Sequence, residues 1–116
     1  MYEVIPYPDK DRALINDLIA DIKSSGNPKN WIDLRKYMDK LAEHGLEMNE
    51  KFKRESFKKL EDDLYELRTT NLRVMFTFFN GKFYILNGFF KKSQSTPPSE
   101  IEIARKHIKN IHKKQW

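Results

Sequence analysis

The sequence contains no cysteine among its 116 residues. This absence excludes a disulfide framework, a thiolate nucleophile and a cysteine-ligated zinc or iron–sulfur site. The chain also lacks a run of about 18 apolar residues, so no transmembrane helix and no membrane partner are expected. Residues 1–6 have neither the basic nor the apolar region of a signal peptide, which favours a cytoplasmic protein. The lack of repeats, low-complexity blocks and Gly/Ser linkers favours a single domain over residues 1–116.

What is present is an uneven distribution of charge. Residues 1–50 contain 7 Lys and Arg against 10 Asp and Glu, a balance of −3, whereas residues 51–116 contain 15 against 7, a balance of +8. A domain with its positive charge in one half is suited to a polyanion, either a nucleic acid or an acidic protein. The alternative is that the excess charge serves only solubility.

Hydrophobic periodicity predicts a strand and two helices in the first half. Residues 2–7 alternate weakly in polarity, which favours a short strand. A helix is predicted to begin at Asp9 and to end before Gly26, and a second to run from Pro28 to Gly45. Their buried faces are expected from apolar residues at helical spacing, which are Leu14, Ile15, Leu18, Ile19 and Ile22, then Trp31, Leu34, Met38 and Leu41.

The second half changes to the period of two that is typical of strands. No element is predicted for residues 46–63, which are mostly polar, and three strands are expected after them, at residues 64–69, 72–79 and 82–90. Asn80-Gly81 supplies a hairpin turn. A last helix follows, with Ser99 and Glu102 as a capping box and an apolar stripe of Ile101, Ala104, Ile108 and Ile111. The predicted fold is α+β, in the order β-α-α-β-β-β-α, with a largely antiparallel twisted sheet packed against helices.

Strand pairing is expected to bring two arginines together. If Thr70-Asn71 is a two-residue turn, Arg68 lies directly opposite Arg73. Like charges in this position are unfavourable unless an anion lies between them, so the pair indicates a binding site. The alternative is that Arg68 forms an ion pair with Glu66 or Glu61.

The register of the next strand decides which lysine joins the arginines. Counted from Asn80-Gly81, Arg73 pairs with Gly88. Strict alternation then puts Lys92 and Tyr84 on the Arg73 face and Lys91 on the other face. A bulge near the end of the strand would favour Lys91 instead. Both lysines are otherwise interpreted as solvated strand ends.

Two arginines and a lysine suit a phosphodiester. Guanidinium groups bind phosphate oxygens bidentately and stabilise the extra charge of a pentavalent transition state. RNA carries its own nucleophile, the 2′-OH, so neither a metal nor another cofactor is needed. The sequence has no phosphate loop, nucleophile elbow or metal-ligand spacing, and its histidines are interpreted as structural or solvated, at His44, His107 and His112.

A second group of basic residues is a candidate for binding the RNA backbone. These residues precede the Arg68 strand and interleave with aromatic side chains, and they are Lys51, Lys53, Arg54, Lys58 and Lys59. The basic face of the last helix is instead interpreted as solvated, because the helix dipole favours cations there.

Three segments together match a known pattern. They are Leu64-Tyr65-Glu66-Leu67-Arg68, then Arg73, and Phe89-x-Lys91-Lys92-x-Gln94-x-Thr96-Pro97-x-x-Glu100-Ile101-x-x-Ala104-Arg105. Over residues 57–105 the sequence resembles the phage-derived HigB-like branch of the RelE/ParE toxin superfamily. The resemblance implies the toxin of a type II toxin–antitoxin system, a metal-independent endoribonuclease that cuts mRNA on the ribosome. A helix-turn-helix antitoxin is the implied partner, and DNA is met only through that antitoxin.

The resemblance also implies roles for single residues. The basic positions of the family are matched by Arg68, Arg73 and Lys91, with Lys92 beside it. Glu66 matches the acidic position, where it orients Arg68 or acts as a general base, and Tyr84 is the other candidate for proton transfer or RNA contact.

Family members often carry glycine just before the Leu-Tyr-Glu-Leu-Arg strand, where this sequence has Asp63. Relatives that poison gyrase share the fold, and a non-catalytic toxin relative can serve as a co-repressor bound to its antitoxin. Both remain alternatives to the nuclease, because fold is a poor guide to chemistry.

Overall fold

The fold is seen in a computed structural model that describes all residues except 10–11, 27, 48–56, 94 and 115–116. Its elements, in chain order, are β1 (Glu3–Pro6), α1 (Ile15–Ser24), α2 (Pro28–His44), the 3-10 helix η1 (Gly45–Glu47), β2 (Phe57–Glu61), β3 (Leu64–Arg68), β4 (Leu72–Phe79), β5 (Lys82–Phe90) and α4 (Pro98–Lys114). This order confirms the predicted α+β class. It adds strand β2, which lies in the segment for which no element was predicted.

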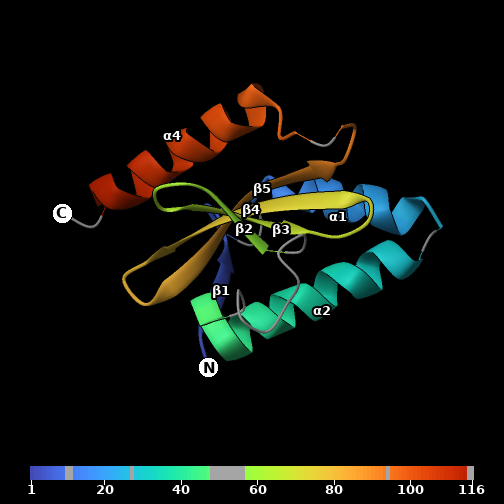
Figure 1. Ribbon diagram of the computed structural model, residues 1–116, viewed down its shortest axis with the longest axis horizontal. Coiled ribbons are helices and arrows are strands. Elements are labelled where there is room, and N and C mark those ends of the chain that lie inside the picture. The colour runs from blue at the N-terminus through green and yellow to red at the C-terminus, as the bar shows by residue number, and fades with distance from the viewer. Residues whose placement is uncertain (10–11, 27, 48–56, 94, 115–116) are drawn as a thin grey trace.

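The strands form one five-stranded sheet in the order β1-β5-β4-β3-β2. Strands β2 to β5 are an antiparallel meander, and β1 joins the edge of β5 in parallel. Figure 1 shows α4 on one side of this sheet and α2 on the other. No helix within the described ranges is long and apolar enough to cross a membrane.

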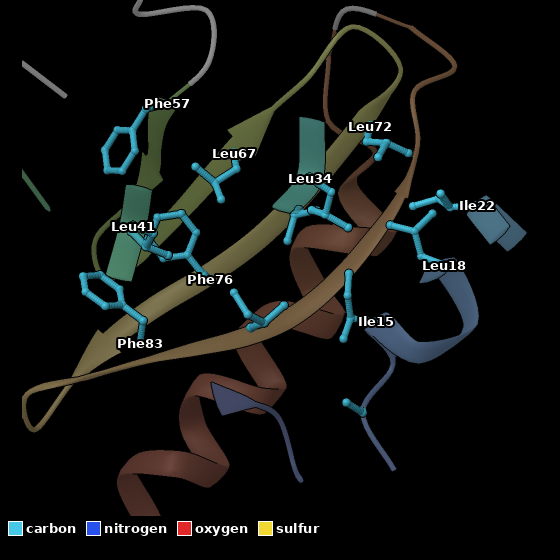
Figure 2. Packing of buried hydrophobic residues seen from close by; sticks show 13 residues of the cluster. Ile15, Leu18, Ile22, Leu34, Leu41, Phe57, Leu67, Leu72, Phe76 and Phe83 are labelled. Carbon is cyan, nitrogen blue, oxygen red and sulfur yellow. The ribbon is translucent and has the colours of Figure 1, made fainter. Parts of the chain in front are cut away.

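The larger hydrophobic core lies between the sheet and helices α1 and α2. Ile15, Leu18 and Ile22 are spaced by three and four residues, so they share one face of α1, and each is at least nine-tenths buried. Figure 2 shows this face and the α2 residues Leu34 and Leu41 near apolar side chains of β3, β4 and β5. Each fully buried aliphatic side chain of this kind contributes roughly 1.5–3 kcal/mol.

A second core lies on the opposite face, beneath α4. Ala104, Ile108 and Ile111 are buried there against Met75 and Leu86 of the sheet. The predicted apolar stripe of the last helix is therefore confirmed. Because both faces of the central strands are covered, β4 is buried along most of its length, which the alternating pattern alone did not require.

Two tight turns have the left-handed backbone that hairpins need. Asn80 and Gly81 have φ angles of 54° and 79°, and Phe79 pairs with Lys82, as predicted. The second turn joins β2 to β3, where Asp63 has a φ of 64°. This is the position at which the similar toxins often carry glycine, the residue that adopts positive φ without steric cost.

Two predicted helix starts are wrong. Helix α1 begins at Ile15 rather than Asp9: Asp9 Oδ1 accepts a hydrogen bond from the Arg12 N–H at 3.0 Å, as at a helix start, but residues 12–14 are not helical. Helix α4 begins at Pro98, so Ser99 lies inside the first turn and forms no capping box with Glu102. Proline lacks an N–H and has a preset φ, which suits the first helical position.

Gly88 allows α1 to approach the sheet closely. A Cβ atom on this residue would lie 2.7 Å from both Ile15 Cδ1 and Leu18 Cδ2, and 3.2 Å from the Arg73 carbonyl oxygen. Gly88→Ala should therefore lower the free energy of unfolding by about 1–3 kcal/mol, the usual cost of overpacking a core. Urea denaturation measures this loss, with Lys82→Ala at an exposed position as control. An unchanged midpoint would show that α1 moves aside without cost.

Candidate functional site

Arg68 of β3 and Arg73 of β4 are directly opposite, as the sequence predicted. The turn between them is Thr70-Asn71, closed by a hydrogen bond from the Thr69 N–H to the Leu72 carbonyl oxygen at 3.1 Å. A short turn fixes the register of the two strands, so both arginine side chains extend from the same face of the sheet, at the end of the β3–β4 hairpin next to the turn. This is the face that α4 covers further along the strands.

A bulge in β5 changes the predicted register. Met75 pairs with Asn87 but Phe76 pairs with Ile85, which leaves Leu86 as an extra residue. Arg73 is consequently paired with Phe89, and the predicted pairing with Gly88 is wrong. The prediction failed because it assumed an unbroken alternation from the Asn80-Gly81 turn.

The same bulge decides between the two lysines. The Lys91 N–H donates to the Asn71 carbonyl oxygen at 2.7 Å, so strand pairing continues one residue beyond β5. Alternation after the bulge places Lys91 on the Arg73 face, together with Phe89. Lys92, the next residue, is exposed and lines a groove with Phe89, Phe90 and Glu100.

Glu66 is the centre of the polar contacts at this site. Its carboxylate is fully buried, with Oε1 accepting from the Arg68 Nε–H at 2.6 Å and Oε2 accepting from the Thr96 hydroxyl at 2.7 Å. The Arg68 side chain is 16% exposed. The ion pair with Glu66, which sequence reasoning left open, therefore exists, and it engages Arg68 through Nε. Among the described contacts the two terminal nitrogens of Arg68 bind no other protein group.

Arg73 is a buried cation, only 6% exposed. Its Nη1 donates to the carbonyl oxygens of Thr69 and Leu72 at 2.8 and 2.9 Å. Burial lowers the pKa of Arg73, the neighbouring Arg68 lowers it further, and Glu66 opposes both effects. Two guanidinium groups thus lie in the field of one buried carboxylate, which only Arg68 binds, an electrostatic arrangement that favours an added anion.

The other predicted site residues fall in different places. Lys58 is exposed on β2 opposite Glu66, and Lys59 is exposed beside it within 3.8 Å of Asp62. Lys51, Lys53 and Arg54 lie outside the described residues.

Tyr84 is not brought to the arginines. It pairs with Thr77, four residues along β4 from Arg73, which is about 13 Å at the usual rise of a strand. Its ring centroid lies 6.4 Å from that of Tyr7, and the side chain packs into the core beneath α4. Tyr84 lies on the same face of the sheet as Arg73, as the alternation counted from the Asn80-Gly81 turn predicted. Its distance along the strand nevertheless separates it from the two arginines.

Sequence reasoning did not assign a site role to Thr96. The available signal was the Thr96-Pro97 pair within the family pattern, just before a helix. The same pattern contains Arg105, which binds Glu61 Oε1 through Nε at 2.6 Å and donates to the Asp62 carbonyl oxygen. Thr96 thus attaches the segment before α4 to β3, and Arg105 attaches α4 itself to the end of β2 and the β2–β3 turn, so part of the pattern serves to seat this helix.

The histidines are packed against aromatic rings or lie at a helix end. His107 lies 4.9 Å from the Tyr7 ring and His112 lies 4.4 Å from the Phe79 ring, measured between centroids. His44 ends α2 beside Glu43, 3.7 Å away. The described part of the chain contains no group of three or more His, Cys, Asp or Glu arranged to hold a metal ion.

A five-stranded, mostly antiparallel sheet between α4 and the α1–α2 pair is consistent with a RelE-like α+β fold. The comparison with protein families is more specific. Residues 32–109 match the family described as Phage derived protein Gp49-like (DUF891). The chain therefore belongs to the Gp49-like family, within the RelE/ParE-like toxin superfamily. No curated protein matches the chain.

The environment of His107 generates a pH dependence of stability. Burial lowers its pKa below 6.5, opposed in part by the Leu86 backbone. The folded protein therefore binds fewer protons than the unfolded chain, so the free energy of unfolding should fall as the pH drops below 6.5. Urea unfolding above and below that pH should show a smaller fall for His107→Gln than for wild type. His44→Gln serves as control, and an equal fall in all three proteins would contradict this origin.

Proposed function

We propose that this protein is the toxin of a type II toxin–antitoxin system and acts as a metal-independent endoribonuclease on mRNA. Membership of the Gp49-like family supports the toxin class. The observation that carries the nuclease is the pair Arg68 and Arg73, opposite each other across one turn, with Arg68 held by the buried Glu66 and Arg73 by backbone carbonyl oxygens. Such a pair is costly in an isolated protein and becomes favourable when a phosphate binds between or above the guanidinium groups.

The proposed reaction is a transesterification within the RNA. The 2′-oxygen attacks the adjacent phosphorus as the 2′-OH loses its proton, and the P–O5′ bond breaks. The products are a 2′,3′-cyclic phosphate and a fragment whose 5′-oxygen has gained a proton. The phosphorane that forms on this route carries more negative charge than the ground state, and fixed guanidinium groups stabilise that extra charge.

Individual roles follow from position. Arg68 presents its terminal nitrogens to the phosphate, and Lys91 adds a cation from the same face. Arg73 acts mainly through its charge, because its Nη1 is held by the backbone. Glu66 serves to orient Arg68 rather than as a general base, since both of its oxygens accept hydrogen bonds and neither is exposed.

The surrounding cations are proposed to hold the RNA backbone. Lys58 and Lys59 are exposed on the edge strand β2, Lys58 on the face of Glu66 and Lys59, paired with Tyr65, on the other face, and Lys92 is exposed beyond β5. Lys53 and Arg54 belong to the same proposal on sequence grounds. Contacts of this kind weaken with salt, because each neutralised phosphate releases counterions.

The proposed partners follow from the toxin class. A helix-turn-helix antitoxin neutralises the protein, and the pair represses its own operon, so DNA is bound only through the antitoxin. The substrate is mRNA on the ribosome. These assignments rest on membership of the Gp49-like family and on the resemblance of residues 57–105 of this sequence to HigB-like toxins.

Loss of either arginine should abolish growth inhibition. Arg68→Ala and Arg73→Ala each remove a charge from the proposed transition-state site, with an expected fall in cleavage rate of about 100-fold or more. Primer extension on cellular mRNA after induced expression should show discrete cuts for wild type and none for the variants. Lys82→Ala, which removes an exposed cation at the far hairpin, should cut like wild type.

The controls separate the alternatives. Because both arginines are largely buried, thermal unfolding and antitoxin pull-down must show that each variant is folded. If folded Arg68→Ala and Arg73→Ala remain fully toxic, the assignment of the site is wrong. DNA-damage signalling without mRNA cuts would identify a gyrase inhibitor. Operator binding in complex, with neither effect, would identify a co-repressor.

A further inference from the structure

The junction before α4 reaches the arginine site through Thr96. Its hydroxyl donates to Glu66 Oε2 at 2.7 Å, across 30 residues of sequence. The other carboxylate oxygen, Oε1, accepts from the Arg68 Nε–H at 2.6 Å. Thr96, Glu66 and Arg68 therefore form a continuous chain of hydrogen bonds from the segment before α4 to the Arg68 guanidinium group.

Burial makes the Thr96 hydroxyl necessary for the orientation of Glu66. The carboxylate is 0% exposed, so water does not take the place of a missing donor at the surface. A buried ionised acceptor that loses a partner is strongly disfavoured, and the group rotates or shifts to find another donor. Rotation of Glu66 moves Oε1, and with it the anchor point of Arg68.

The sequence around Thr96 makes the hydroxyl a rigid donor. A β-branched side chain has few χ1 rotamers, and a proline at the next position restricts the backbone of the residue before it. The carbonyl oxygen of Pro97 accepts hydrogen bonds from the N–H groups of Glu100 and Ile101 at 3.0 and 3.3 Å. The position of the hydroxyl is thereby set by the first turn of α4.

We propose that Thr96 is a positioning residue, which holds the Glu66 carboxylate so that Arg68 directs its terminal nitrogens towards a bound phosphate. The part of this proposal that concerns phosphate rests on the proposed nuclease function. The part that concerns Arg68 does not, since it is a statement about the order of one side chain in the free protein. Thr96 itself touches neither the substrate nor the reacting atoms in this proposal.

The first experiment measures the order of Arg68 without any activity. Hydrogen exchange of the Arg68 Nε–H, followed by NMR on the full chain, should become about tenfold faster in Thr96→Val, which keeps the shape of the side chain but lacks the hydroxyl. Thr96→Ser restores a donor and should exchange like wild type. Thr70→Val, in the exposed β3–β4 turn, is the matched control and should also exchange like wild type.

The second experiment tests whether Thr96 acts through Arg68. In RNA cleavage, Thr96→Val should lower kcat by about tenfold with little change in KM, and Thr96→Ser should recover most of it. In an Arg68→Ala background the same substitution should cause no further loss, because the group it positions is absent.

The outcomes decide the two proposals separately. Unchanged Arg68 Nε–H exchange in Thr96→Val overturns the positioning role, and so does an equal loss of kcat with and without Arg68. If Thr96→Val does not fold, Thr96→Ala and Thr96→Ser carry the same comparison. A wild-type protein that cleaves no RNA overturns the nuclease, while the exchange measurement still tests the position of Arg68.

Discussion

The buried carboxylate of Glu66 is the constraint on which the site depends. A fully buried negative charge is stable only when donors reach it from its surroundings, and here they come from Arg68 on the same strand and Thr96 before α4. Strand β3 and the start of α4 must therefore lie together. Before the other end of β3, Arg105 binds Glu61 at the end of β2 and the Asp62 carbonyl oxygen in the β2–β3 turn. Helix α4 is therefore attached to the β2–β3 hairpin by polar contacts as well as by its apolar stripe.

The bulge in β5 links the geometry of the sheet to the composition of the site. One extra residue, Leu86, reverses the alternation of everything that follows it in the strand. The reversal brings Lys91 to the face of Arg68 and Arg73 and, by alternation, assigns Lys92 to the other face. It also places Gly88 so that a Cβ atom would point towards α1, where the close approach of Ile15 and Leu18 leaves no room for one. Packing of α1 and selection of the lysine are thus two consequences of one local irregularity.

The positive charge of residues 51–116 has two different forms in the structure. Lys58, Lys59 and Lys92 are exposed, so their interactions are screened by water and salt. Arg68 and Arg73 are held in partly or largely buried positions by fixed hydrogen bonds. Electrostatic stabilisation is stronger when charges are preorganised and removed from water, which is why two arginines matter more to the proposed chemistry than the surplus of lysines around them.

The sequence by itself determined the α+β class, the presence of the first two helices, the Asn80-Gly81 turn and the opposition of Arg68 to Arg73, because each depends on patterns and contacts of residues close together in the chain. It did not determine strand β2, whose single buried residue, Phe57, leaves too weak a pattern, nor the start of α1, because Asp9 makes a capping contact with Arg12 that is not continued as a helix through residues 12–14. Only the tertiary structure decided the bulge that selects Lys91, the distance that separates Tyr84 from the arginines, and the contact of Thr96 with Glu66. These depend on how strands and helices far apart in sequence pack on both faces of one sheet, and packing of that kind leaves no periodic signal in the sequence.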